Sequence, residues 1–174
     1  MNSRLEKIID LKKYPIQDLC SPVVKNLIKK CRDDLDKFSC AIIPNFILQN
    51  SIKIMNDELE KQLDEVYMSK QSINAYLYSK DDASLPKDHP KRIFMDRDNG
   101  YLNSNVFKKN SEMRFLYEQE ELLKFISACL GISPIYRWAD PLACHAYNVM
   151  NPEGVLPWHF DSCEFTLSFM IQKP

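Results

Sequence analysis

Two side chains near the end of the sequence, those of His159 and Asp161, are of the kinds that bind metal ions. They lie two positions apart, so on a β-strand both would project from the same face. Trp158 and Phe160 would then project from the opposite face. An imidazole nitrogen and a carboxylate oxygen are two of the three ligands in a facial site of two histidines and one carboxylate. The spacing alone is a weak signal, because such a pair is more often a surface or hydrogen-bonded one.

The residues around this pair predict the β-structure that would hold it. From residue 165 to residue 171 every second side chain is large and apolar, which is the period of a strand with one buried face. Four short strands are expected after Gly131, separated by turn residues: 133–137, 143–150, 156–161 and 164–172. The last of these would leave an open apolar edge.

The amino-terminal part of the sequence predicts helices instead. Ser21 followed by Pro22 is a helix start, with the serine as N-cap, and apolar residues then recur at helical spacing as far as Leu35. Residues 40–43 are a short apolar run that ends at a proline, which favours a buried strand. A second helix is expected over residues 50–66.

A third helix is expected over residues 111–130, with Gly131 at the position where a glycine often ends a helix. Residues 80–105 are rich in Asp, Pro and Lys and predict a long surface loop. We therefore expect one α+β domain over residues 1–174. Its first part, 1–130, would be mainly helical, and its second part, 131–174, would hold the strands and the His-x-Asp pair.

Composition bounds the class of protein. The 174 residues are 45% hydrophobic and 27% charged, which is typical of a globular domain with a core. A net charge of −1 gives no overall attraction to nucleic acid or to an anionic membrane. The charged start and the lack of an apolar run of about 18 residues predict a cytoplasmic protein without a membrane span. The three glycines form no phosphate-binding pattern, and the six cysteines form no C-x-x-C motif.

Several short motifs together resemble one enzyme family. The segments 140–142 (Asp-Pro-Leu), 148–149 (Asn-Val) and 158–161 (Trp-His-Phe-Asp) are similar to the core of the non-haem Fe(II)/2-oxoglutarate-dependent oxygenases. The closest likeness is to the bacterial group of amino-acid halogenases and hydroxylases. Residues 88–92 and 98–101 also look like the long loop of that group.

This resemblance implies a fold, a set of cofactors and a reaction. The fold would be an incomplete double-stranded β-helix, or jelly-roll, with the amino-terminal helices packed on it. The cofactors would be Fe(II), with 2-oxoglutarate as cosubstrate, and O2. His159 and Asp161 match the first two metal ligands of the family. Halogenating members have a small residue where Asp161 stands, so we expect hydroxylation of a small molecule such as a free amino acid.

The family's second histidine ligand and its 2-oxoglutarate-binding arginine are not found after Asp161. We therefore expect residues 1–174 to be the amino-terminal part of a longer protein. His145 could substitute as a ligand, although strand histidines beside aromatic rings are more often packed and hydrogen-bonded. Asn148 could hydrogen-bond the cosubstrate, or it could be an ordinary polar residue at a ladder edge.

A second class of function stays open from the sequence. A chain whose apolar edge at residues 164–172 pairs with a second copy, or with a partner chain, would be a non-catalytic binding module. If the oxygenase interpretation holds, three carboxylates are candidates for holding the ammonium group of an amino-acid substrate, although most such acids are simply solvated. They are Asp140, Glu153 and Glu164.

Overall fold

The computed structural model describes residues 4–173 and has mixed α/β architecture. Within these residues the α-helices are α1 (Leu5–Ile8), α2 (Pro22–Phe38), α3 (Gln49–Glu60), α4 (Glu112–Tyr117) and α5 (Glu120–Leu130). The strands β1 (Tyr67–Asn74), β2 (Phe94–Leu102) and β3 (Tyr147–Val149) form one antiparallel sheet in the order β1-β2-β3. Short 3-10 turns cover Leu63–Glu65, Pro90–Arg92 and Ser104–Val106.

The first predicted helix is confirmed, together with its cap. The Ser21 hydroxyl accepts a hydrogen bond from the Val24 N–H, and Pro22 occupies the first turn of α2. α2 packs against α5, and the Arg32 guanidinium joins the two helices by donating to the Ala128 carbonyl. Residues 40–43, which were expected to form a strand, do not form one, and Ile42 is exposed.

The third predicted helix is two helices, α4 and α5, with a break at residues 118–119. The buried side chains explain this break. At about 100° per residue, one straight helix would place Leu116 and Leu122 about 120° apart around its axis, so they could not both point into one core. The break turns both into the same core. The predicted end is confirmed, since Gly131 follows α5 with φ 71° in the left-handed region.

The predicted loop 80–105 is wrong in its second half, because residues 94–102 are strand β2. β2 pairs with β1 along its length, and Tyr101 of β2 lies across from Tyr67 at one end of the ladder. Asn99 and Gly100, a pair that often forms a turn, lie inside this strand. A Cβ on Gly100 would lie 2.5 Å from the Val66 Cγ1 atom, so only a residue without a side chain fits at this position.

The β layer expected after residue 131 is mostly absent in the described chain. Of the four predicted strands only 143–150 contains one, the three residues of β3, and a jelly-roll is not confirmed. A strand needs a hydrogen-bonded neighbour along its length, and residues 164–172 have none. Two of the alternating apolar side chains in this segment, Phe169 and Ile171, nevertheless pack against the core.

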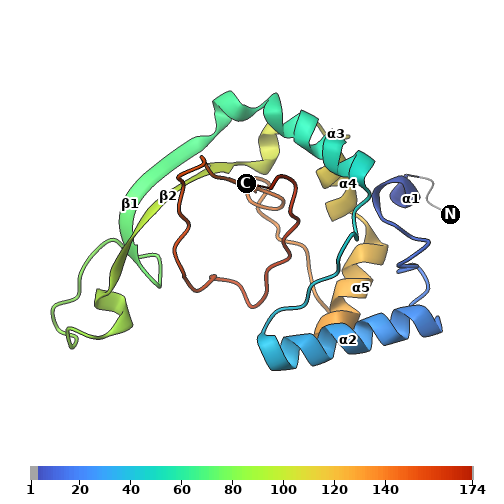
Figure 1. Ribbon diagram of the computed structural model, residues 1–174, viewed down its shortest axis with the longest axis horizontal. Coiled ribbons are helices and arrows are strands. Elements are labelled where there is room, and N and C mark those ends of the chain that lie inside the picture. Colours follow the sequence, from blue (N-terminus) through green and yellow to red (C-terminus); the bar gives the residue numbers. More distant parts are fainter. Residues whose placement is uncertain (1–3, 174) are drawn as a thin grey trace.

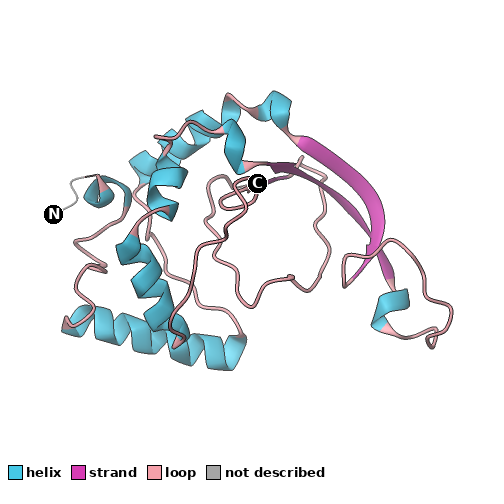
Figure 2. Cartoon of the chain, turned by 180° about the vertical axis from the view of Figure 1, so that it is seen from behind, coloured by secondary structure: helices cyan, strands magenta, loops and turns pink. Residues whose placement is uncertain are grey.

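The elements form an arc, with the helices at one end and the long hairpin of β1 and β2 at the other (Figure 1). The carboxy-terminal loops run inside this arc in both views (Figures 1 and 2). The core lies among the helices and includes Leu5, Ile8, Val24, Met55, Leu102, Leu116 and Phe125. Among residues 4–173, no helix combines the length and the apolar character that crossing a membrane requires.

Candidate metal-binding pair

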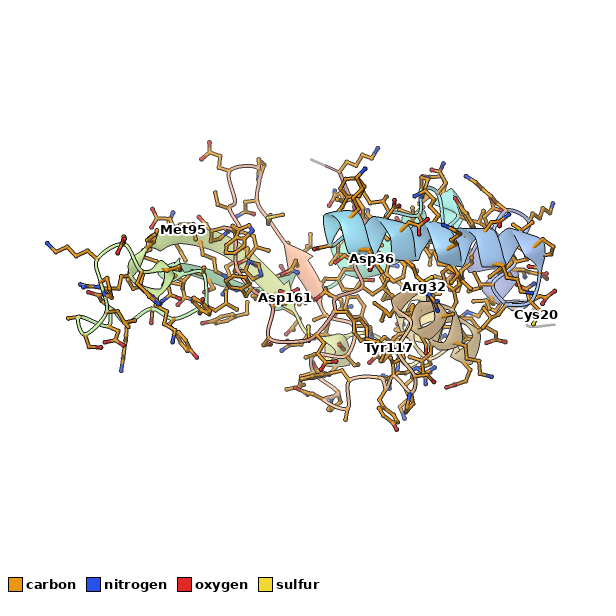
Figure 3. All side chains as sticks on the ribbon, turned by 90° about the horizontal axis from the view of Figure 1, so that it is seen from below. Cys20, Arg32, Asp36, Met95, Tyr117 and Asp161 are labelled. Atoms are coloured by element: carbon orange, nitrogen blue, oxygen red, sulfur yellow. The ribbon has the colours of Figure 1, made fainter. Side chains whose placement is uncertain are left out.

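Two backbone contacts hold the segment that carries His159 and Asp161. Val155 forms an isolated antiparallel bridge with Asp98 of β2, with N···O distances of 2.7 and 2.8 Å. The Phe160 N–H donates to the Ala75 carbonyl, just after β1, over 2.9 Å. The segment is thus tied to both long strands although it forms no strand itself. Figure 3 labels Asp161 between the hairpin and the helical body.

The structure brings the two predicted ligands together. The His159 Nε2 atom lies 3.2 Å from the Asp161 Oδ1 atom. The His159 Nδ1 atom lies 2.7 Å from the Pro157 carbonyl oxygen, which can only accept a hydrogen bond. Nδ1 therefore carries the proton, and in the neutral imidazole Nε2 is left as an acceptor. Two acceptors face one another over 3.2 Å, and this arrangement is favourable only with a proton or a cation between them.

The second carboxylate oxygen of Asp161 has its own partner. Asp161 Oδ2 accepts a hydrogen bond of 2.5 Å from the Thr166 hydroxyl. This bond, with the Pro157 bond to His159, occupies the other polar atom of each side chain and leaves Oδ1 and Nε2 facing each other at 3.2 Å. Outer hydrogen bonds of this kind orient the ligands of metal sites.

The pair has the spacing of two neighbouring ligands on one ion. Two ligand atoms at right angles, each about 2.1 Å from an octahedral ion, lie about 3.0 Å apart. The separation of 3.2 Å between Nε2 and Oδ1 fits this geometry. Within residues 4–173 no third His, Cys, Asp or Glu joins them in a metal-sized group. The residues present therefore fit two positions of a metal site and not a complete set.

His145 does not join this pair. It is only 9% exposed, and its ring packs beside those of Phe107 and Tyr117, with centroid distances of 6.4 and 5.8 Å. Its Nδ1 atom lies 3.0 Å from the Cys144 Sγ atom. The structure supports the packed interpretation of this histidine, although its buried Nε2 atom has no hydrogen-bond partner within residues 4–173. It belongs to no group of metal-binding side chains in the part of the chain that the structure describes.

Burial lowers the pKa of His145, and the charge of Arg114 adds to this effect. The folded protein then binds fewer protons at this site than the unfolded chain just below pH 6.5, the ordinary histidine value. We expect the free energy of unfolding to fall as the pH drops from 7 to 5. Urea unfolding of the parent and of His145→Gln at several pH values measures this, and the variant should show a shallower fall. An NMR-titrated His145 pKa at or above 6.5 would contradict the prediction.

Asn148, the predicted cosubstrate contact, belongs to a row of polar side chains on one face of the sheet. Asn148 lies opposite Tyr101 of β2, and Tyr101 is two positions along that strand from Asn99. The Arg97 Nε atom donates to Asn99 Oδ1 over 2.5 Å, and Asn99 Nδ2 donates to Asn148 Oδ1 over 3.4 Å. The Arg97 guanidinium also lies over the Tyr101 ring, 4.9 Å from its centroid. Asn148 is exposed at the outer end of this row.

Arg97 is the residue that the sequence analysis missed. It is only 9% exposed, yet no carboxylate among residues 4–173 lies within ion-pair distance of its guanidinium. A buried charge without an opposite charge is unfavourable, so this position is suited to a bound anion. The alternation of Arg97, Asn99 and Tyr101 could have indicated one face of a strand. It was not used because these residues were predicted to lie in a loop.

The three candidate carboxylates for an ammonium group are all exposed. Asp140 Oδ1 accepts a hydrogen bond from the Leu142 N–H and so closes a local turn. Glu153 and Glu164 have no ion pair in the part of the chain that the structure describes.

Comparisons of the chain with known protein families, characterised proteins and solved structures give no match. The case for a function therefore rests on the geometry above.

Proposed function

We propose that the chain is part of a non-haem Fe(II)/2-oxoglutarate-dependent oxygenase that hydroxylates a small molecule, such as a free amino acid. The observation that supports this best is the facing pair of acceptor atoms, His159 Nε2 and Asp161 Oδ1, at 3.2 Å. Imidazole and carboxylate are the donors that a facial Fe(II) site uses, and their separation suits one ion.

His159 and Asp161 would hold two positions of the iron, with Pro157 fixing the imidazole and Thr166 fixing the carboxylate. The family's third protein ligand is a histidine, and no third metal-binding side chain lies beside this pair within residues 4–173. Bound Fe(II), with 2-oxoglutarate and O2, supplies the oxidising power for cleaving an unactivated C–H bond. The protein's own task is to orient the ligands and the substrate.

The polar row on the sheet supports a ligand with a carboxylate. Arg97 offers guanidinium N–H groups that make no ion pair within the described chain, and Asn99 and Asn148 continue the row outward. A guanidinium is the side chain best suited to bind a carboxylate. Both 2-oxoglutarate and a free amino acid carry this group, so the row fits either part of the proposed reaction.

The test is the Fe(II)-dependent conversion of 2-oxoglutarate to succinate, with ascorbate and a panel of free amino acids present. Free imidazole at millimolar concentration is added in parallel, so that it can occupy the missing third protein position. We expect succinate to form with the parent chain and imidazole, and not with Asp161→Ala. Equal succinate from the parent and from Asp161→Ala, with and without imidazole, would overturn the proposal.

A partner-dependent binding module remains the second candidate, and one observation favours it. Large apolar side chains of the carboxy-terminal third are exposed, among them Trp158 at 64% and Met170 at 70%. Residues 164–172 form no strand, so the partner would cover these side chains and not the strand edge that was expected there. Light scattering over a range of concentrations separates the two cases, because a monodisperse monomer leaves this candidate without support.

A further inference from the structure

The side chain of Asn74 organises the turn that follows β1. It is almost fully buried, and its Nδ2 atom donates to the Lys91 carbonyl over 2.7 Å. Its Oδ1 atom accepts from the backbone N–H groups of Tyr76 and Tyr78, over 2.9 and 3.2 Å. One amide therefore joins the two ends of the loop between β1 and β2 and fixes the backbone at Tyr76.

Tyr76 connects this turn to the segment that holds the metal-binding pair. Its ring lies against the ring of Phe160, with centroids 5.2 Å apart, and the Lys91 ammonium lies 5.6 Å from its centroid. Phe160 also donates its N–H to the carbonyl of Ala75, the residue between Asn74 and Tyr76. Phe160 is thus held by both its backbone and its side chain at the same turn.

Phe160 is the residue between the two ligands. No helix or strand includes residues 156–161, so the spacing of His159 and Asp161 is not fixed by a regular backbone. We propose that Tyr76, held in place by Asn74, is a positioning residue that sets the His159–Asp161 geometry by docking Phe160. This inference rests on the proposed metal site and adds the element that positions it.

Metal sites tolerate little displacement of their ligands, about 0.5 Å, and the loss of an outer contact typically weakens binding by about 10- to 100-fold. Tyr76 is partly exposed, and its hydroxyl makes no hydrogen bond within residues 4–173. Its contribution therefore comes from the ring. A phenylalanine at this position should serve equally well, and an alanine should not.

The experiment measures Co(II) binding through the visible absorption of the bound ion, with Co(II) as the probe for Fe(II). We expect Tyr76→Ala to bind about 10- to 100-fold more weakly than the parent chain. Tyr76→Phe should bind as the parent does. Tyr136→Ala is the matched control, because Tyr136 is 79% exposed and belongs to no such contact. Equal affinity of Tyr76→Ala and the parent would overturn the positioning role while leaving the metal site intact.

A second readout does not depend on the ion. The imidazole 15N shifts of His159, measured without metal at one fixed pH, report whether the Nδ1 proton stays bonded to Pro157. We expect Tyr76→Ala to change these shifts and Tyr76→Phe to keep them. If the parent fails to bind Co(II), the proposed function fails. The positioning role then stands or falls on these shifts, and unchanged shifts in Tyr76→Ala would overturn it.

Discussion

Replacing His159 by alanine is expected to weaken Co(II) and Fe(II) binding by at least about 100-fold, since even outer contacts of metal ligands contribute 10- to 100-fold. Asp161→Asn should have a similar effect, because the amide keeps the size of the side chain and removes its charge. Both changes remove one of the two atoms that face each other over 3.2 Å. Isothermal titration and the visible spectrum of bound Co(II) measure the loss.

Two variants serve as controls for this result. Glu164→Gln removes an exposed carboxylate from the same segment and should leave the affinity unchanged. Thr166→Val removes the hydroxyl that donates to Asp161 Oδ2, and it should cause a smaller loss than Asp161→Asn. Equal weak binding in the parent, His159→Ala and Glu164→Gln would mean that the ion binds elsewhere, and the metal-site proposal would then be wrong.

The largest effect on stability is expected from Phe125→Ala. Phe125 is only 2% exposed and stacks on Phe46, with ring centroids 6.0 Å apart and planes at 15°. Truncating a buried phenylalanine leaves a cavity and typically lowers the free energy of unfolding by about 3–5 kcal/mol. Urea denaturation followed by circular dichroism measures this loss as a lower midpoint with an unchanged slope.

Phe38→Ala is the matched control for this change. Phe38 ends α2 and is 62% exposed, with the Lys37 ammonium 5.0 Å from its ring centroid. A surface substitution of this kind is usually worth less than about 1 kcal/mol. Comparable losses in Phe38→Ala and Phe125→Ala would show that α5 does not form the centre of the core.

The features that the sequence predicted correctly are determined by neighbouring residues. Ser21 and Pro22 act on the first turn of their own helix, and Gly131 acts on the turn directly before it. Such features need no knowledge of distant parts of the chain. The facing of His159 and Asp161 was expected from a strand, but residues 156–161 form none, and the segment is held instead by contacts with distant residues such as Ala75 and Tyr76.

The features that were predicted wrongly depend on distant partners. Residues 164–172 have the alternation of a strand, but a strand forms only where another strand pairs with it. Residues 94–102 have the composition of a loop, yet pairing with β1 makes them a strand. Arg97 was missed for the same reason, since its place on a sheet face depends on this pairing.

The bond from the Phe160 N–H to the Ala75 carbonyl joins residues 85 positions apart. Closing so long a loop carries an entropy penalty that only the formed hairpin can offset, so this contact should form late in folding. During synthesis the helices and the β1–β2 hairpin leave the ribosome well before residue 160 does. We therefore expect the helical body and the hairpin to fold without the metal ion, and the ion to bind only after the contact between Phe160 and Ala75 has formed.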